Sequence, residues 1–266
     1  MKITFIGGGT MGEALLKSII TKRVAASGDI TVSDVSQKRR DTLKKNYKVK
    51  TTDRNLEAAK KSEVIILAVK PQDVNTVLQE LQGLSPKQLV LSIAAGVTLE
   101  TLRKGLDHTN LIRAMPNMPA QIGKGMTVWT ALPEVSQKQK DMAKAVLAAS
   151  GEELYVKSEK YIDMATAVSG SGPAYIFLVI EALTDAGVHI GLPRDIAEKL
   201  VIETVIGSAR AVKATGKHPA ELRNMVTSPG GTTTEGILQL ETGGLRSLLL
   251  RAVIAAFDKA KSLGAK

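Results

Sequence analysis

Short apolar segments alternate with amphipathic ones along the first half of the chain. Residues 2–6, 29–33, 64–69, 89–93 and 110–113 have the length and apolar content of strands. The run at 64–69 is apolar throughout, as a parallel strand buried on both faces requires. Residues 11–26, 36–45, 54–61 and 98–105 lie between these strands and have helical character. This alternation predicts an α/β fold with a Rossmann-type, doubly wound parallel sheet.

The pattern changes after about residue 157. Helical periodicity then continues over residues 172–189, 194–214, 218–226, 232–241 and 244–263, with Gly and Pro between the segments. We therefore predict a dinucleotide-binding domain at residues 1–160 and an all-helical domain at residues 161–266. The helical half carries more apolar surface than so small a unit can bury, which favours a homodimer that assembles into a higher oligomer.

Composition narrows the functional classes. The chain has no cysteine, which excludes disulfides and thiolate chemistry. The net charge of +10 is compatible with nucleic-acid binding, but the basic residues are scattered and only 3% of residues are aromatic, so we expect no nucleic-acid partner. We see no signal-type segment and no apolar run of membrane-spanning length, and we expect a cytoplasmic protein with no membrane partner.

The first predicted strand runs into the motif Gly7-Gly8-Gly9-Thr10-Met11-Gly12. In a Gly-x-Gly-x-x-Gly turn between strand and helix, Gly7 forms the tight turn, Gly9 lets the backbone approach a pyrophosphate, and Gly12 allows close packing of helix and strand. The helix N-terminus then offers free N–H groups to phosphates. We predict a nicotinamide dinucleotide site here, although a plain tight turn would also use glycines.

Two signals conflict over which dinucleotide is bound. Asp34 follows the second strand, where an acidic side chain bonds the adenosine ribose of NADH. Lys38, Arg39 and Arg40 come soon afterwards and suit the 2′-phosphate of NADPH, or they form the solvated first turn of a helix. The cofactor is therefore expected to be NADPH or NADH.

Two further loops follow predicted strands. Val69-Lys70-Pro71 ends one strand and Ala94-Ala95-Gly96 follows the next. Ligands of open α/β sheets bind beyond the carboxyl ends of the strands, so both loops are cofactor candidates. Tight packing alone would also explain the small residues at 94–96.

Several blocks give the chain a resemblance to pyrroline-5-carboxylate reductase, in that family's order and spacing over essentially the whole chain. These are Ala68-Val69-Lys70-Pro71, Ser92-Ile93-Ala94-Ala95-Gly96-Val97, Arg113-Ala114-Met115-Pro116-Asn117, Ser169-Gly170-Ser171-Gly172-Pro173-Ala174-Tyr175, and His218-Pro219 followed by Ser228-Pro229-Gly230-Gly231-Thr232-Thr233.

The resemblance implies hydride transfer from NAD(P)H to the cyclic imine 1-pyrroline-5-carboxylate, which gives L-proline in the last step of proline biosynthesis. With the residues that end the strands, the predicted cofactor set is Gly7, Gly8, Gly9, Thr10, Met11, Gly12, Ser33, Asp34, Asn55, Ala68, Val69, Lys70, Pro71, Ala94, Ala95 and Gly96. The predicted substrate set is Glu159, Gly231, Thr232 and Thr233. Many NADPH-using relatives carry a neutral or basic residue at the position of Asp34, so the resemblance leaves the cofactor preference open.

The residues around Thr233 suggest how a cyclic imino acid is held. Thr232-Thr233-Thr234-Glu235 has the spacing of a capping box at a helix start. Backbone N–H groups near Gly231 and Thr232 suit the substrate carboxylate, and the Thr233 hydroxyl suits the ring nitrogen. A purely structural helix start is the alternative.

Other arrangements of catalytic residues are weaker. None of His108, His189 and His218 lies in an acid–base or metal pattern, and we expect no metal. A 3-hydroxy-acid-type dehydrogenase of the same architecture would need an acid–base lysine, for which Lys199 or Lys213 is the candidate. A non-catalytic dinucleotide sensor is the second alternative.

Overall fold

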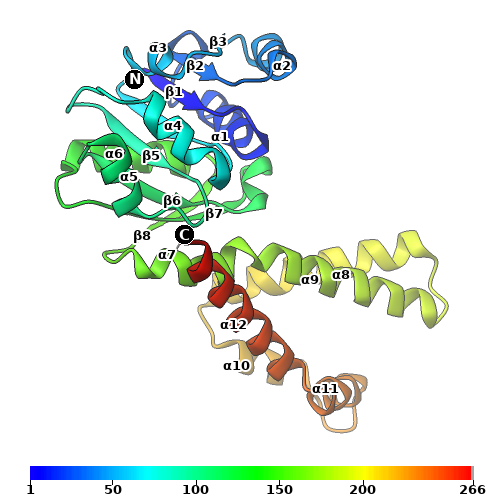
Figure 1. Cartoon of the computed structure of the whole chain (residues 1–266). Coiled ribbons are helices and arrows are strands. Elements are labelled where there is room, and N and C mark those ends of the chain that lie inside the picture. The colour runs from blue at the N-terminus through cyan, green and yellow to red at the C-terminus, as the bar shows by residue number, and fades with distance from the viewer. Residues whose placement is uncertain (265–266) are drawn as a thin grey trace. The chain divides into compact units, whose positions relative to one another are not determined.

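The structure is a computed structural model that describes residues 1–264 (Figure 1). By its internal contacts the chain forms two compact units. The first unit comprises Met1–Ser171 together with the chain from Ala256 onward, and the second comprises Gly172–Ala255. The boundary predicted at residue 160 falls at the start of α7 (Lys160–Ala165), inside the first unit.

The first unit contains one eight-stranded sheet in the order β3-β2-β1-β4-β5-β6-β7-β8. Every neighbouring pair is parallel except β6 and β7, which are antiparallel. The strands are β1 (Ile3–Ile6), β2 (Ile30–Ser33), β3 (Lys50–Thr52), β4 (Val64–Leu67), β5 (Leu89–Ser92), β6 (Leu111–Met115), β7 (Gly125–Ala131) and β8 (Gly151–Tyr155). The doubly wound order is confirmed, with an antiparallel step near one edge.

Helices cover both faces of this sheet. They are α1 (Thr10–Thr21), α2 (Gln37–Tyr47), α3 (Asn55–Ala59), α4 (Val74–Glu80), α5 (Leu99–Leu106) and α6 (Gln137–Ala148). Short turns of 3-10 helix are η1 (Ser27–Asp29), η2 (Pro71–Asp73) and η3 (Met118–Ile122), and α7 continues into the π-helical turn η4 (Thr166–Gly170).

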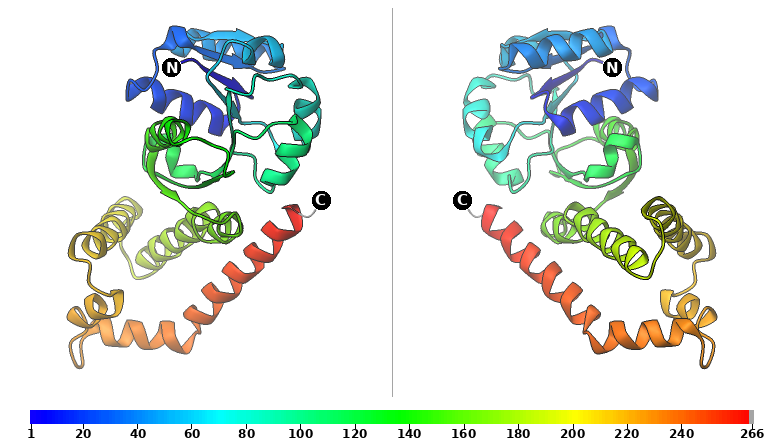
Figure 2. Two further views of the ribbon diagram at one scale, coloured as in Figure 1. Left: turned by 90° about the vertical axis from the view of Figure 1, so that its left-hand side faces the viewer. Right: turned by 90° about the vertical axis from the view of Figure 1, so that its right-hand side faces the viewer.

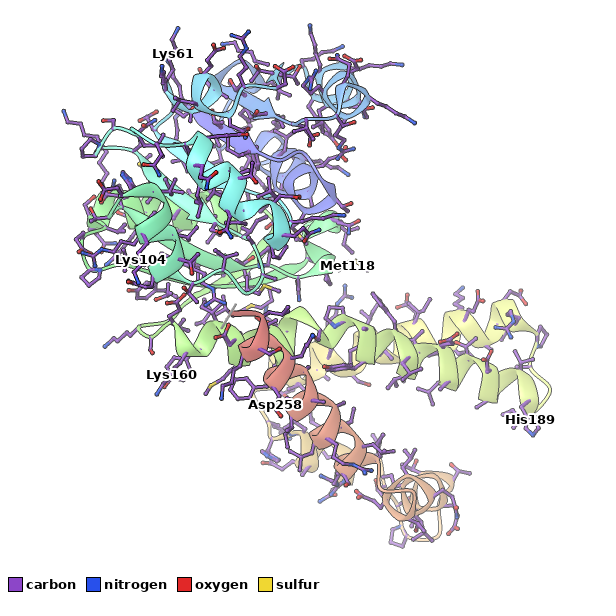
Figure 3. All side chains as sticks on the ribbon, viewed as in Figure 1. Lys61, Lys104, Met118, Lys160, His189 and Asp258 are labelled. Atoms are coloured by element: carbon purple, nitrogen blue, oxygen red, sulfur yellow. The ribbon has the colours of Figure 1, made fainter. Side chains whose placement is uncertain are left out.

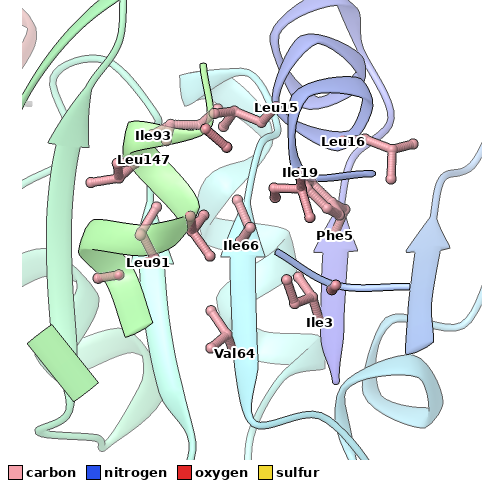
Figure 4. Close-up of a cluster of buried hydrophobic side chains, with 14 of the residues drawn as sticks. Ile3, Phe5, Leu15, Leu16, Ile19, Val64, Ile66, Leu91, Ile93 and Leu147 are labelled. Carbon is pink, nitrogen blue, oxygen red and sulfur yellow. The ribbon is translucent and has the colours of Figure 1, made fainter. Parts of the chain in front are cut away.

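The continuous apolar run in β4 is explained by two buried clusters, one on each face of the sheet. Val64 and Ile66 belong to the cluster that α1 and α6 cover (Figure 4), and Ile65 and Leu67 belong to the cluster under α4 and α5. Successive strand residues point to opposite faces, so both faces need apolar side chains. This arrangement directs the carboxyl ends of β1, β2, β4 and β5 to one edge.

The second unit is helical and covers little of its own surface. Its helices are α8 (Gly172–His189), α9 (Arg194–Thr215), α10 (Pro219–Met225), α11 (Thr232–Thr242) and most of α12 (Leu245–Gly264). The helices α8 and α9 run side by side, whereas α10, α11 and α12 make few contacts with one another (Figure 2). Within residues 172–255 only Thr184 and Ala197 are buried.

The expectation that no apolar segment has membrane-spanning length is wrong for one helical stretch. Residues 160–189 are helical from Lys160 to His189 (Figure 3), and by length and composition this stretch could cross a membrane. Only 6% of its most apolar window is buried in the chain. This one segment is weak evidence for a membrane span, because a helix that packs on a partner subunit has the same composition.

Candidate functional site

A cavity of about 580 Å³ lies at the carboxyl ends of β1, β2 and β4, entirely within the first unit. The predicted cofactor residues among its lining are Gly7, Gly9, Ser33, Asp34, Asn55, Ala68, Val69 and Lys70. Val35, Thr76 and Glu80 also line the cavity but were not predicted from the sequence. Val35 is a hydrophobic residue that directly follows Asp34 and is 91% exposed, and its position after the second strand was the available signal.

The glycine turn has the geometry that its motif requires. Gly7 has φ +93°, and a Cβ atom there would lie 2.7 Å from the carbonyl oxygen of Ala68. At Gly12 a Cβ atom would lie 2.8 Å from the carbonyl oxygen of Gly7, so the start of α1 packs closely on the turn. Gly9 is the N-cap of α1, makes no side-chain cap and faces open space. The free N–H groups of the first turn of α1 are therefore accessible.

Asp34 anchors the glycine turn. Its Oδ2 accepts a hydrogen bond from Gly8 N and its Oδ1 accepts one from Ser36 N, both at 2.8 Å. Gly7 N donates to the carbonyl oxygen of Ser33 at 2.8 Å. The Asp34 carboxylate therefore fixes the turn as well as facing the cavity.

Arg39 is engaged within the protein. Its Nε donates to the carbonyl oxygen of Gly8, and its Nη2 donates to Glu13 Oε2. Glu13 Oε1 accepts from the Tyr47 hydroxyl at 2.7 Å. Burial opposes ionisation of Glu13, but the bonds from Tyr47 and Arg39 outweigh it and lower its pKa. Burial, together with the bond to Glu13, raises the pKa of Tyr47 to about 12.

The basic cluster at 38–40 therefore has less freedom than the sequence suggested. Arg40 donates to the carbonyl oxygens of Asp34 and Val35 and pairs with Asp53, while Arg39 holds Gly8 and Glu13. Lys38 lies exposed near the start of α2. Of the three, Lys38 is the side chain that could bind a phosphate without breaking hydrogen bonds or ion pairs like those of Arg39 and Arg40.

A second cavity of about 350 Å³ lies between two of the predicted cofactor loops. Pro71 lines it from one loop, and Ala95 and Gly96 line it from the loop between β5 and α5. Leu263, near the end of α12, also lines it. Asn55 belongs to the first cavity, where its Nδ2 donates to Glu80 Oε2 at 2.5 Å.

Glu159 is held by contacts within the first unit. Its Oε1 accepts from Arg113 Nη1 and from Leu99 N, both at 2.8 Å. The Nη2 of the same guanidinium donates to Asp163 Oδ1 at 2.6 Å, and the Arg113 side chain is 3% exposed. Glu159 thus ties α7 to β6 and to the start of α5. Arg113 lies in one of the sequence motifs, but no role was predicted for it. Its partners, Glu159 and Asp163, lie far away in the sequence.

The loop before α11 belongs to the second unit. Gly231 N donates to the carbonyl oxygen of Ser228 at 3.1 Å, and Gly230 has φ +69°. The Thr234 hydroxyl donates to the same Ser228 oxygen at 2.7 Å. Thr233 is half-buried, and its solvent-accessible hydroxyl has no hydrogen-bond partner within residues 1–264.

The capping box predicted at Thr232 and Glu235 is wrong. The N-cap of α11 is Gly231, which has an extended backbone and no side-chain cap, and the helix already includes Thr232. The hydroxyl that closes the preceding turn is that of Thr234. The helix starts at residue 232, as its predicted range had it, but Gly231 and not Thr232 is the cap, so its first N–H groups have no side-chain cap.

Two of the three histidines have structural contacts. His108 is buried, and its Nε2 lies 2.8 Å from the carbonyl oxygen of Gln88. His218 is the N-cap of α10, where its Nδ1 accepts from Ala220 N at 3.2 Å. His189 ends α8.

The residues around the first cavity fit a dinucleotide. Ser33 and Asp34, at the carboxyl end of β2, line the cavity beside the glycine turn. The uncapped N-terminus of α1 lies at the same cavity, through Gly9, and suits a phosphate.

Two family models match the chain. One is described as pyrroline-5-carboxylate reductase dimerisation and matches residues 159–263. The other is described as NADP oxidoreductase, coenzyme F420-dependent, and matches residues 2–96. Together they cover the strands β1 to β5 of the sheet and the helical unit.

Full-length relatives agree with these matches. A curated pyrroline-5-carboxylate reductase from Synechocystis sp. is 47% identical over 266 residues, which are 100% of this chain and 99% of the relative. A solved pyrroline-5-carboxylate reductase from Coxiella burnetii has a TM-score of 0.91 and 39% identity, covering 98% of each chain. The Plasmodium falciparum enzyme, solved with NADP bound, has a TM-score of 0.90 and 31% identity over 99% of this chain and 98% of its own.

Proposed function

The chain belongs to the pyrroline-5-carboxylate reductase family and is an NAD(P)H-dependent oxidoreductase acting on a C=N bond, and from that premise we propose the role of each part of its site. The reaction reduces 1-pyrroline-5-carboxylate to L-proline. The observation that carries the assignment is the 47% identity over the full length of a curated reductase. The rival 3-hydroxy-acid dehydrogenase has no comparable support.

Different groups of the predicted cofactor residues bind different parts of the dinucleotide. The turn at Gly7–Gly12 and the N-terminus of α1 hold the pyrophosphate through backbone N–H groups. Ser33 and Asp34 face the adenosine ribose, with Asn55 beside them. Ala68, Val69, Lys70 and Pro71, together with Ala94, Ala95 and Gly96, border the nicotinamide half. The reduced nicotinamide supplies the hydride for the imine carbon.

The substrate offers two polar groups, a carboxylate and a ring nitrogen. The uncapped N–H groups at Gly231 and Thr232 bind the carboxylate at the N-terminus of α11. The unpartnered Thr233 hydroxyl accepts the N–H of the protonated imine and orients the C=N bond. We assign Glu159 to holding the start of α5, because Arg113 and Leu99 already engage its carboxylate.

Asp34 makes NADH the better of the two cofactors. Its carboxylate faces the cavity and is held in place by Gly8 N and Ser36 N, so it would repel the 2′-phosphate of NADPH. Arg39 would have to leave Gly8 and Glu13 to compensate for that charge. Lys38 has no such contacts to give up and is the residue that would moderate the preference.

The enzyme acts in the cytoplasm as a homo-oligomer built from dimers, with a small-molecule substrate and no nucleic-acid or membrane partner. Support for the dimer comes from the match of residues 159–263 to a dimerisation family and from the burial of only Thr184 and Ala197 within residues 172–255.

Steady-state kinetics with NADH and NADPH side by side test this proposal. With 1-pyrroline-5-carboxylate we expect loss of the reduced-nicotinamide absorbance and formation of L-proline in equal amounts. A higher kcat/KM with NADPH than with NADH would contradict the role of Asp34. Binding of cofactor without turnover would instead support the dinucleotide-sensor hypothesis.

A further inference from the structure

The end of α12 packs against the loop between β5 and α5. Gly96 in that loop has φ +74°, and a Cβ atom built on it would lie 2.9 Å from Leu263 Cβ and 3.2 Å from the carbonyl carbon of Leu263. Ala260, one turn earlier, is 6% exposed. All three residues belong to the first unit. The contact leaves no room for a side chain at position 96.

Leu263 also lines the second cavity. The other lining residues include Pro71 and Gln72 of the β4 loop and Ala95 and Gly96 of the β5 loop. Leu263 therefore borders the same cavity as the two loops that border the nicotinamide half in the proposed site. Leu263 is 46% exposed, so its burial contributes little to the stability of the unit.

The far end of the β5–α5 loop is held as well. Glu159 Oε1 accepts from Leu99 N, the first residue of α5, and Arg113 fixes Glu159. The backbone at the other end is fixed because Ile93 N donates to the carbonyl oxygen of Leu67 at 3.0 Å. The middle of the loop, at Gly96, meets Leu263.

We propose that Leu263 is a positioning residue, which holds the β5–α5 loop through Gly96 and thereby sets the nicotinamide half of the cofactor. The inference rests on the proposed assignment of Ala94–Gly96 to the cofactor. The site needs this contact because a glycine with positive φ is otherwise free to change conformation. Leu263 acts through the loop and not by touching the substrate.

Leu263→Gly tests this role, because it removes the Cβ atom that meets Gly96, whereas an alanine would keep that atom. The KM for NADH and for NADPH should rise by about threefold to tenfold, below the roughly 100-fold that a 1 Å misplacement costs. The KM for the imine should stay at the wild-type value. Ser262→Gly is the matched control for the helix cost of glycine, because within residues 1–264 the side chain of this exposed neighbour bonds only the carbonyl oxygen of Lys259.

A double-mutant cycle tests the contact itself. Gly96→Ala should weaken cofactor binding, because the new Cβ collides with Leu263 Cβ in addition to its unfavourable φ. Leu263→Gly should restore part of that loss, whereas Ser262→Gly, with the same helix cost, should restore none. Equal effects of the two glycine variants would overturn the proposal, as would unchanged cofactor KM values in Leu263→Gly or a rise in KM that accompanies a melting temperature below that of Ser262→Gly.

Ala95→Leu separates this proposal from the cofactor assignment. A larger side chain in the loop should weaken cofactor binding whatever Leu263 does. If Ala95→Leu leaves cofactor affinity unchanged, the loop assignment fails and the role of Leu263 fails with it. If Ala95→Leu weakens binding and the Leu263 variants do not, only the positioning role is overturned.

Discussion

At the scale of single residues, neighbouring threonines in the loop before α11 have different tasks. The Thr234 hydroxyl closes the Ser228 turn at 2.7 Å, and the Thr233 hydroxyl has no partner in residues 1–264. An accessible hydroxyl without a protein partner, beside uncapped helix N–H groups, is available to bond a ligand. We therefore expect Thr233 to bind the ligand and Thr234 to stabilise the loop.

Thr233→Ala should lower kcat/KM for the imine about ten- to hundredfold, because a hydrogen bond to a charged partner contributes about 1.5–3 kcal/mol. Melting temperature and cofactor affinity should stay unchanged. Thr234→Ala is the matched control and should lower the melting temperature through the lost Ser228 bond. Full turnover in Thr233→Ala, or inactivity caused by unfolding, would show that the role of Thr233 is wrong.

Asp34→Ala should raise the NADPH-to-NADH ratio of kcat/KM about tenfold if about 1.4 kcal/mol of repulsion is relieved. Because Asp34 also holds Gly8 N and Ser36 N, this variant should weaken binding of both cofactors. Asp34→Asn removes the charge but keeps one acceptor oxygen, so it should change the ratio with less loss of affinity. A ratio that is the same in wild type and both variants would remove Asp34 from cofactor selection.

At the scale of secondary-structure elements, the sequence predicted β1, β2, β4, β5 and β6, whose buried faces leave an apolar signal. It missed β3 (Lys50–Thr52), a short polar strand at the sheet edge with no buried residue. No element was predicted over residues 114–157, where β7, α6 and β8 form. The strand β8 (Gly-Glu-Glu-Leu-Tyr) is an exposed sheet edge with two acidic residues. Its pairing with β7 is a tertiary effect that overrides weak local propensity.

The same limit applies to the site. The glycine turn and the strand-end loops are local signals, so the sequence located most of the first cavity. The roles of Arg39, Glu159 and Leu263 depend on partners distant in the sequence, namely Gly8, Arg113 and Gly96. Periodicity carries no information about such pairs.

Arg113→Ala should destabilise the first unit by about 3–5 kcal/mol, because it leaves Glu159 and Asp163 close together without their cation. The three side chains join β6, the start of α5 and α7. Arg54→Ala is the control, since its pair with Glu57 is fully solvated and should contribute almost nothing. Equal melting temperatures for the two variants would contradict a structural role for Arg113.

The link between α1 and α2 should depend on pH. The pKa of Glu13 is lower in the folded protein than its ordinary value of 4.5, so its contribution to stability is present above that value and lost as the pH falls through the folded pKa. Glu13→Gln should lower the melting temperature by about 2–4 °C at neutral pH, for a pair that contributes about 1 kcal/mol. The difference should shrink below pH 4.5. A difference that is constant with pH would show that the ion pair is not its source.

At the scale of the whole molecule, the two units bury their apolar residues differently. The sheet of the first unit has a buried cluster on each face, whereas residues 172–255 bury only Thr184 and Ala197. Exposed apolar side chains gather on α8, where Ile176, Phe177 and Leu178 are each about half exposed or more. An apolar surface of this extent on one helix pair requires a partner.

A second copy of the chain is the partner that we expect, because residues 159–263 match a dimerisation family. Sedimentation at micromolar concentration should therefore give a dimer or a multiple of it. Leu178→Asp places a charge on a side chain that is 65% exposed in the single chain and should be desolvated in the dimer, so it should yield monomers or a strongly raised dissociation constant. Ile122→Asp is the matched control, because Ile122 is 77% exposed but lies in the first unit, and its assembly should be unchanged. If wild type sediments as a stable monomer, or if Ile122→Asp dissociates the assembly while Leu178→Asp does not, the helices of the second unit do not form the interface.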